Sequence, residues 1–490
     1  MGAKAHAAVN VPIGSSLYND LDILEVKGLI PSSMLSTRPL SRREAARVVR
    51  EARERLRDNP GIVSMEAAQG PLRRLEGAFK DELSGAQDAT YIKPVDTMYA
   101  KLLYAGDARP FFADINNNGD ASTRGYNFRG GFSLRGQIWD SVSFYLNPEY
   151  RLDKDASGTK LVTGYLDTEL WNIELEAGRD SMWWGPGYRG DLILTNNAEP
   201  LDLIKLSAAE PVPLPWVFSY LGILKPTFFL THLEKMRDFP RANVLGMRLD
   251  FKPTGNFQFA LNRVFMFGGH GKPTPNSSEW VKAFFAYNGY EHSKSASKGN
   301  QIASLDASYV FVNESGRAWL PFSGIKLYTE WGAEDSAGDM APTGRADVEG
   351  IYIDEPLWIR NTDLRVEWAN TAHNLQYADA WYTHGVYTTG YTFNGRVIGH
   401  PVGTDSRDLF LRVQRHTRGG ATFGAETDVM HARVNEPQME RRYWYAADVR
   451  YPVGEGAEAS VGAGVERTAR YVTSERLMNA VTWFRLEWLL

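Results

Sequence analysis

One run of the sequence combines the side-chain types that proteins use to hold sugars. Residues 179–191 read RDSMWWGPGYRGD, and residues 192–198 continue as LILTNNA. The aromatic rings could stack on sugar rings, and the polar groups could hydrogen-bond sugar hydroxyls. The candidate glycan contacts in this run are Trp183, Trp184, Tyr188, Arg189, Asp191, Asn196 and Asn197. The alternative is a structural loop folded into the mouth of a barrel, with its rings buried and its polar groups paired locally, and we favour that structural role.

A second run, residues 114–120, resembles the front half of a calcium-binding loop. Oxygen-bearing side chains alternate along it, and Gly119 occupies the sixth position, as such loops require. The bidentate acid expected at the twelfth position is missing, because Gly125 stands there. We therefore favour a polar loop turn over a calcium site, and we expect no other cofactor. The four candidate calcium ligands are Asp114, Asn116, Asn118 and Asp120.

Other kinds of chemistry are excluded or lack a signature. The sequence contains no cysteine, which excludes disulfides, thiol catalysis and cysteine-based zinc sites. It has no nucleophile elbow, phosphate-binding loop or H-E-x-x-H zinc motif, and its nine histidines form no recognisable metal pair. The 54 basic and 59 acidic side chains give a net charge of −5, which offers no case for a nucleic-acid partner. We therefore expect a protein that is not an enzyme.

The elements that must position these residues are strands. From about residue 92 to the end, the hydrophobic pattern has a period of two, as in residues 126–138 and, across a short turn, in residues 142–152. The polar faces carry ionic groups of both signs, which is typical of a wet barrel lumen rather than of a sandwich. No stretch of 18 or more apolar residues exists, which argues against a membrane-spanning helix.

The number of alternating segments indicates a membrane barrel. They amount to about 18 strands of about ten residues each. Aromatic residues make up 12% of the chain, with 14 Trp and 23 Tyr, and these suit the interfacial girdles of such a barrel. The predicted fold is an all-β membrane protein, an antiparallel outer-membrane β-barrel with a small N-terminal helical bundle. An even strand count places both chain ends in the periplasm.

The N-terminal part has a different period. Residues 14–91 are predicted to be a helical segment in the periplasm, with a capping box at Ser41 and Glu44 and a further helix after Pro71. Residues 1–13 are interpreted as a signal remnant or a disordered N-terminus. The barrel is assigned to residues 92–490.

The connections between strands alternate in length. Short turns are predicted at 140–141, 253–255, 417–420 and 453–456, and long segments near 105–124, 267–299, 334–361 and 383–404. This alternation is typical of periplasmic turns and extracellular loops. Further candidate glycan contacts in or beside the long segments are Trp280, Tyr287, Tyr290, Trp358, Trp381, Tyr387 and Tyr391.

Several of these segments resemble one known family. The run at 179–198 is similar to the most recognisable segment of the Wzi capsule-assembly family. Further similar segments are residues 246–253 (GMRLDFKP), 395–401 (GRVIGHP), 403–409 (GTDSRDL), 21–28 and the Arg38-Pro39 junction. The resemblance implies an outer-membrane barrel of about 18 strands with a periplasmic helical bundle. It also implies a surface lectin that helps capsular polysaccharide assemble on the cell, with no catalytic motif to carry over.

The leading expectation is a non-enzymatic outer-membrane protein that binds capsular or exopolysaccharide through extracellular loops and helps attach or assemble it at the cell surface. Its expected partners are outer-membrane lipid, the polysaccharide and a polysaccharide export machinery, and we expect a monomer. The alternative is an outer-membrane porin or channel for small solutes or glycans, because ionic groups face the lumen. An outer-membrane enzyme, the third hypothesis, would need catalytic groups assembled only in space.

Overall fold

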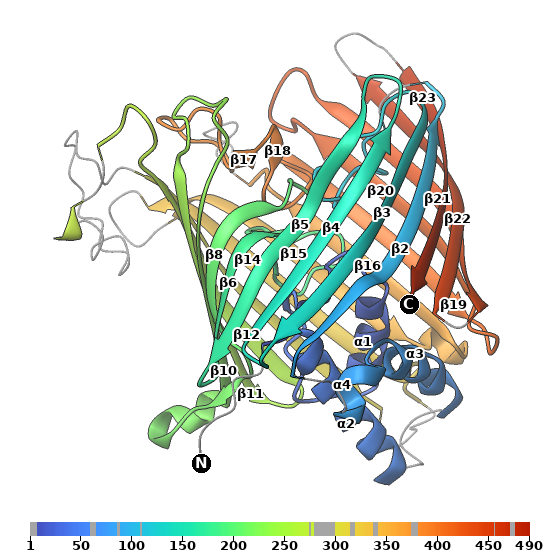
Figure 1. The fold of residues 1–490 in the computed structure, drawn as a ribbon. Helices are drawn as coiled ribbons and strands as arrows, with labels where there is room; N and C mark the ends of the chain where they lie inside the picture. Colours follow the sequence, from blue (N-terminus) through green and yellow to red (C-terminus); the bar gives the residue numbers. More distant parts are fainter. Residues whose placement is uncertain are drawn as a thin grey trace.

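The chain forms a closed antiparallel barrel of 18 strands, which confirms the fold expected from the sequence. The computed structural model describes residues 7–58, 65–85, 89–107, 110–273, 276–278, 299–313, 319–336, 342–373, 381–454, 456–470 and 476–490. Helices gather at one end of the barrel and long loops at the other (Figure 1). These two ends are called the helical end and the loop end below.

The barrel strands follow one another around the wall, each hydrogen-bonded to the next along the chain, and the last pairs with the first. They are β2 (Tyr91–Ala105), β3 (Gly125–Ile138), β4 (Val142–Leu152), β5 (Ser157–Leu170), β6 (Ile173–Asp180), β8 (Leu201–Ala208) with its short extension β9 (Val212–Pro213), β10 (Ile223–His232), β11 (Asn243–Thr254), β12 (Phe257–Phe267), β13 (Asn300–Val312), β14 (Gly324–Ser336), β15 (Pro342–Asp354), β16 (Thr362–Asn370), β19 (Ser406–His416), β20 (Thr422–Ala432), β21 (Glu440–Gly454), β22 (Ala457–Arg470) and β23 (Arg476–Leu489).

The remaining elements are short. The helices are α1 (Leu17–Val26), α2 (Arg42–Asp58), α3 (Met65–Ala78) and α4 (Lys80–Ser84), and the 3-10 helices are η1 (Trp216–Leu221) and η2 (Pro356–Trp358). Two small ladders are not part of the barrel wall: β1 (Thr37–Arg38) pairs with β7 (Trp183–Trp184), and β17 (Thr392–Phe393) pairs with β18 (Arg396–Val397). Among the described helices, none combines the length and the hydrophobicity needed to cross a bilayer.

The wall is apolar outside and ionic inside. On β3, Tyr126 faces outward and is 70% exposed, whereas Arg129 and Arg135 face the lumen and are 4% and 1% exposed. The same alternation is seen on most of the other strands, because successive side chains of a strand point to opposite faces. Apolar side chains outside and polar side chains inside are typical of outer-membrane barrels, whose outer face contacts lipid.

One long segment predicted to be a loop is partly strand. Residues 334–361 contain β15, whose loop-end half has the opposite polarity from the rest of the wall. Ala346 and Val348 face inward and are 2% and 1% exposed, while Asp347 and Glu349 alternate with them. The inward side is apolar here because it packs against a hydrophobic cluster inside the lumen. The sequence prediction was wrong because it assumed a polar lumen throughout.

Tryptophans mark the turns at the helical end. Five of them are highly exposed, and each lies in a connection between two strands at that end. Tryptophan concentrates at membrane interfaces, where its ring is partly apolar and its N–H can reach water. The exposed fractions are 80% for Trp139, 74% for Trp171, 88% for Trp216, 70% for Trp319 and 58% for Trp358. Trp358 therefore lies at the helical end and not, as predicted, in a loop at the other end.

The N-terminal segment enters the lumen from the helical end. Helix α1 packs against the inner face of β13, β14 and β15, and it is held by ion pairs to lumen-facing residues. Lys326 binds Glu25 at 2.6 Å and Arg365 binds Asp22 at 3.0 Å. The sequence predicted the helices but not their insertion, because the positions that the wall presents to them are known only once the barrel closes.

A fully buried arginine ties this segment to the wall. Arg248 of β11 is 0% exposed and binds Asp306 of β13 at 2.6 Å and Asp250 at 3.4 Å. It also donates to the hydroxyls of Thr37 at 2.6 Å and Ser36 at 3.0 Å. A buried charge is tolerated only when it is paired and hydrogen-bonded, and here the N-terminal segment completes that pairing.

Replacing Arg248 with Met should strongly destabilise the protein, because Asp250 and Asp306 would remain buried without their common counter-charge. We expect a loss of about 3–5 kcal/mol, measured as a fall in Tm in detergent by circular dichroism. Arg179→Met is the matched control: it removes an outer-face pair with the half-exposed Asp202 and should cost about 0–1 kcal/mol. Equal losses for the two variants would contradict this role for Arg248.

Candidate functional site

The loop between β6 and β8, residues 181–200, folds back into the barrel. Trp183 and Trp184 form β7 and pair with Thr37 and Arg38 of the N-terminal segment. The N–H of Gly185 donates to Ser36 O at 2.8 Å. A loop from the loop end and a segment from the helical end therefore meet inside the lumen. We call residues 181–200 the plug loop.

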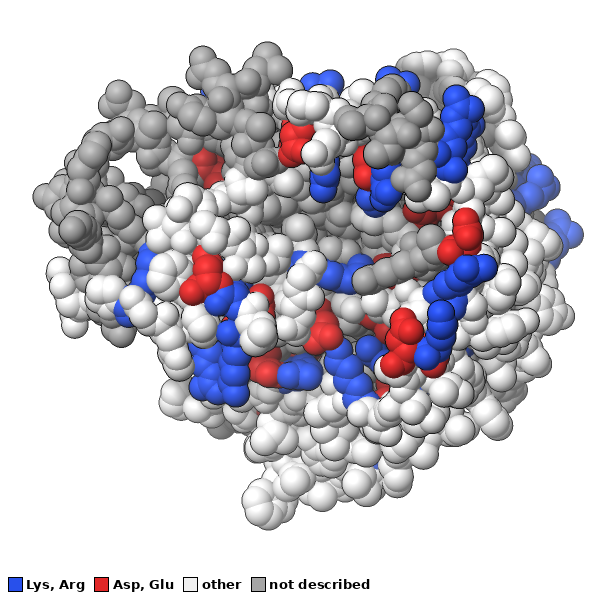
Figure 2. Space-filling view, turned by 90° about the horizontal axis from the view of Figure 1, so that it is seen from above, with Lys and Arg blue, Asp and Glu red and all other residues white. Residues whose placement is uncertain are grey.

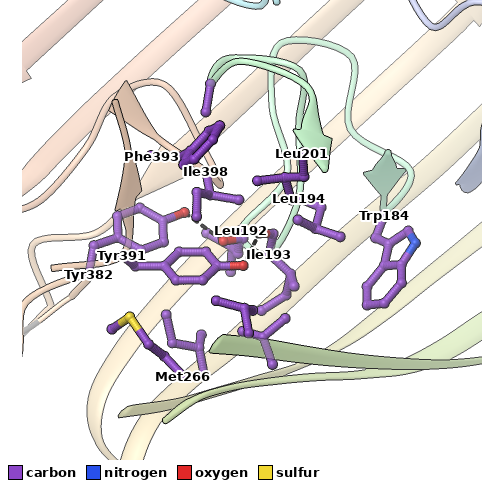
Figure 3. Close-up of a cluster of buried hydrophobic side chains, with 14 of the residues drawn as sticks. Trp184, Leu192, Ile193, Leu194, Leu201, Met266, Tyr382, Tyr391, Phe393 and Ile398 are labelled. Carbon is purple, nitrogen blue, oxygen red and sulfur yellow. Dashed lines mark hydrogen bonds between the residues drawn. The ribbon is translucent and has the colours of Figure 1, made fainter. Parts of the chain in front are cut away.

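The plug loop carries a hydrophobic cluster into the lumen. Leu192, Ile193 and Leu194 are at most 1% exposed and pack against inward residues of the wall. Figure 3 shows Tyr382 and Tyr391 of the 381–405 loop lying beside them. Tyr382 donates to Leu192 O at 2.6 Å and Tyr391 donates to Ile193 O at 3.1 Å. The two loops thus share one core, which rigidly fixes both.

Wall carboxylates bind the backbone of the plug loop. Glu367 of β16 accepts hydrogen bonds from three consecutive N–H groups, those of Tyr188 at 2.7 Å, Arg189 at 2.9 Å and Gly190 at 3.1 Å. Glu330 of β14 accepts from Leu192 N at 2.6 Å. A loop buried inside a protein must satisfy its backbone donors, and lumen-facing carboxyl groups do so here.

Close packing explains the glycines of this run. Gly185 has φ of +135°, a conformation that side chains rarely adopt, and a Cβ there would overlap the carboxylate of Asp191. Asp191 is 0% exposed, and its Oδ1 accepts from Gly187 N at 2.9 Å. Burial, followed by the nearby Glu330 and Glu367, raises the pKa of Asp191 well above its ordinary value. Asp191 is therefore held in its neutral form more readily than a carboxyl in water.

Most of the glycan contacts suggested by the sequence are buried in the plug. Trp183, Trp184 and Trp381 are 4%, 0% and 1% exposed, so their rings present no open face on which a sugar could stack. The other buried candidates are Asp191, Asn196, Asn197, Tyr387 and Tyr391. The burial of these rings is what the structural alternative expects. Trp280, Tyr287 and Tyr290 lie outside the described residues.

Tyr188 and Arg189 of the plug loop also bind to residues of the barrel wall. The Tyr188 ring stacks on Phe410, with centroids 5.8 Å apart. The Arg189 guanidinium binds Asp428 at 2.7 Å and lies over the ring of Phe410. Burial, and then Arg189, lowers the pKa of His400 to about 3, so this imidazole is neutral. Tyr188 and Arg189 both anchor the plug to β19 and β20.

Each of the suggested calcium ligands has a hydrogen-bond or ion-pair partner in the protein. Asp114 accepts from Ser122 N at 2.8 Å, and Asp120 binds Arg129 at 3.0 Å. Asn116 donates to Arg189 O at 2.6 Å, and Asn118 accepts from the Ser181 hydroxyl at 3.0 Å. The contacts of Asn116 and Asn118 tie residues 110–124 to the plug loop, and this bonding is what the preferred interpretation of a polar loop expects.

A cavity of about 350 Å³ remains beside the plug. It lies between residues 112–122 and the inner wall formed by β2, β3 and β20 to β23. Seen from the loop end, the barrel is hollowed, with acidic and basic side chains inside the hollow (Figure 2). The lining residues that can meet a ligand from within the lumen are Lys101, Phe112, Asn116, Asn117, Asp120, Arg129, Glu426, Trp444, Ser460, Trp483 and Arg485.

The cavity combines stacked rings with hydrogen-bonding groups. The rings of Phe112 and Trp444 have centroids 6.1 Å apart, and those of Trp444 and Trp483 are 6.3 Å apart. Trp444 and Phe112 are buried, while Trp483 is half-buried and lies at the cavity. The indole N–H of Trp444 donates to Glu426 at 2.8 Å. An aromatic surface ringed by charged and amide groups can bind a polar molecule with an apolar face.

Sequence reasoning missed this cavity, although a signal for it exists. Trp444 stands between the outward Tyr443 and Tyr445, and Trp483 precedes the outward Phe484. Both tryptophans therefore fall on the polar, lumen-facing side of their strands. An aromatic residue in a polar phase is the informative exception to the alternating pattern. The contribution of Phe112 could not be found this way, because its loop has no period.

Replacing Asp191 with Asn should remove a loss of folding stability that the parent protein undergoes as the pH rises. A carboxyl whose pKa is raised on folding contributes stability that is present at low pH and lost as the pH rises towards its folded pKa. The Tm of the variant relative to the parent should therefore increase from acidic to alkaline pH. Asp155→Asn, in an exposed turn, is the control and should show a flat difference. A flat difference for Asp191→Asn as well would contradict the burial argument.

The fold has a close counterpart among solved structures. Wzi from Escherichia coli, described as an outer-membrane protein involved in group 1 capsule assembly and as a carbohydrate-binding β-barrel, superimposes with a TM-score of 0.72. The alignment covers 98% of this chain and 99% of that chain, at 19% sequence identity. At this identity the likeness establishes the shared fold.

Sequence comparison identifies the family. An uncharacterised 55.8 kDa protein from the cps region of Klebsiella pneumoniae is 26% identical over 355 residues, which is 72% of this chain and 63% of that protein. The match therefore spans less than two thirds of that relative. The family model described as capsule assembly protein Wzi matches residues 109–481, which include the plug loop, the 381–405 loop and most of the barrel. The chain belongs to the Wzi family of capsule assembly proteins.

Proposed function

We propose that this protein is an outer-membrane barrel that binds capsular polysaccharide at its loop end and helps attach or assemble it at the cell surface. The proposal rests on membership of the capsule assembly family and on the aromatic and ionic cavity beside the plug. The carbohydrate binding described for the Escherichia coli barrel of the same fold agrees with it.

The cavity is the observation that carries the proposal. The half-buried ring of Trp483 offers an apolar face for the C–H groups of a sugar. Lys101, Asp120 and Arg485 surround it with charged hydrogen-bonding groups, which suit hydroxyls and the carboxylates of acidic sugars. A single such site binds weakly, but repetition along a polymer raises the overall affinity.

The orientation follows from the two ends of the barrel. The tryptophan-marked turns and the helices are placed in the periplasm, and the long loops outside the cell, because short turns face the periplasm in such barrels. The helices then remain available to a polysaccharide export machinery. A closed barrel leaves no unpaired strand edge to which a second copy could add a strand, and the proposed working unit is a monomer embedded in outer-membrane lipid.

A wide channel is the less favoured alternative. The plug loop and the 381–405 loop bring a hydrophobic core into the lumen, and α1 enters it from the helical end.

Catalysis is also not proposed. Two cavity carboxylates are already engaged, since Asp120 binds Arg129 and Glu426 binds Arg412 at 2.7 Å, which leaves neither as an unpaired general acid or base.

Replacing Trp483 with Ala should weaken binding of the detergent-purified protein to the capsular polysaccharide of its own cell. We expect about a tenfold loss of affinity, equivalent to about 1.4 kcal/mol, because the stacking face is removed. Arg485→Met is a second cavity variant with a similar expected loss. Trp139→Ala, at the helical end and 80% exposed, is the control and should bind like the parent. Unchanged binding by both folded cavity variants would exclude this cavity as the glycan site.

The protein should show little ion conductance in planar bilayers. The inserted loops and α1 narrow the lumen, so the single-channel conductance should fall well below that of an open barrel of the same strand number. A variant in which residues 186–190 are replaced by a shorter Gly-Ser linker should conduct more, because it loses the side-chain contacts of Tyr188 and Arg189 with the wall. A large conductance for the intact protein would revive the channel alternative.

A further inference from the structure

Three buried carboxylates meet on the lumen side of the wall near the helical end. They belong to Asp167 on β5 and to Glu174 and Glu176 on β6, two neighbouring antiparallel strands. One carboxylate oxygen from each lies within 4.8 Å of those of the other two. Their residues are 3%, 7% and 1% exposed. No other cluster of this kind occurs among the described residues.

The charge of this cluster is only partly balanced. Lys205 of β8 binds Glu176 at 2.6 Å and Glu174 at 3.2 Å, and supplies one positive charge. Asp180 lies close by and shares with Glu176 the side-chain amide of Asn10, at 3.1 and 2.8 Å. One ammonium thus faces several buried carboxylates. Like charges held together away from water repel strongly, so the site has a surplus of negative charge to be compensated.

Unpartnered oxygen atoms point to the same place. Neither carboxylate oxygen of Asp167 has a hydrogen-bond partner among the described residues. Ser143 of β4 is the direct cross-strand neighbour of Asp167. It is 1% exposed, and its hydroxyl also has no partner among the described residues. Buried polar groups are almost always satisfied, so three orphaned oxygens beside two more carboxylates indicate a missing electropositive partner.

We propose that Asp167, Glu174 and Glu176, with the Ser143 hydroxyl, bind a divalent cation, and that the cation is Ca²⁺. All the ligands are hard oxygens, as Ca²⁺ prefers. Ca²⁺–oxygen bonds of about 2.3–2.6 Å allow two ligands to stand up to about 5 Å apart, and the three carboxylate oxygens all lie within 4.8 Å of one another. Mg²⁺ dehydrates reluctantly and usually keeps several waters, so a buried set of protein ligands suits it less well.

The cation would fasten the N-terminal segment to the wall. Glu176 contacts both the proposed ion and Asn10, whose N–H also donates to the Tyr165 hydroxyl at 2.8 Å. Neutralising the carboxylates would remove the repulsion that opposes this docking. The ion would therefore act on the helical end of the barrel, separately from the glycan cavity.

The test uses the full-length protein in detergent, stripped with a chelator. Terbium is titrated as a luminescent substitute for Ca²⁺ and excited through the stacked pair Tyr145 and Tyr165, whose rings are 5.7 Å apart. Calorimetric titration with Ca²⁺ gives the affinity and stoichiometry. We expect saturable terbium luminescence that Ca²⁺ displaces, one ion bound per chain and a Tm that rises with Ca²⁺ concentration.

Variants locate the ion. Asp167→Asn should weaken Ca²⁺ binding by about 10- to 100-fold or more, and Ser143→Ala should weaken it less. Glu210→Gln, which alters a half-exposed carboxylate paired with Arg43, is the matched control and should bind like the parent. Absence of Ca²⁺ and terbium binding by the parent protein would overturn the proposal. So would unchanged affinity in both Asp167→Asn and Ser143→Ala. If Asp167→Asn does not fold, the parent titration and Ser143→Ala still decide the question.

Discussion

The rest of the structure depends on one interaction: hydrogen bonds from the backbone of the inserted plug loop to carboxylates of the inner wall. Glu367 receives three consecutive N–H groups and Glu330 a fourth. Without such partners, a loop in the lumen would leave donors unsatisfied, at a cost of about 1–3 kcal/mol each. With them, residues 181–200 can leave the solvent and carry an apolar cluster into a lumen whose wall is otherwise ionic.

The apolar cluster inside the lumen requires apolar rather than ionic residues at the inward positions of the strands that contact it. Ala346 and Val348 face inward because they meet the plug, and the polarity of β15 is reversed over that stretch. The far side of the lumen keeps its ionic lining and retains a cavity of about 350 Å³. The barrel is therefore divided between a packed half and a half that can still admit a ligand, and the glycan proposal belongs to the second.

The two ends of the molecule are linked through the plug. Thr37 and Arg38, which belong to the helical end, pair with Trp183 and Trp184, which belong to a loop of the opposite end. Arg248 and its carboxylates fix the same N-terminal segment to the wall. A continuous packed route therefore joins the loop end of the barrel to the helices.

The sequence by itself determined the barrel, the approximate number of strands and the part of the chain that forms helices, because alternation and helical periodicity are local properties of the chain. It also marked residues 179–198 as special, and the favoured structural role for that run agrees with the burial of Trp184 and Asp191. Only the tertiary structure decided which inward side chains meet. The cavity at Trp483 and the insertion of α1 each join residues far apart in the chain, and the carboxylates around Asp167 meet across the pairing of β5 with β6. Their proximity depends on strand register and barrel closure, which no local pattern encodes.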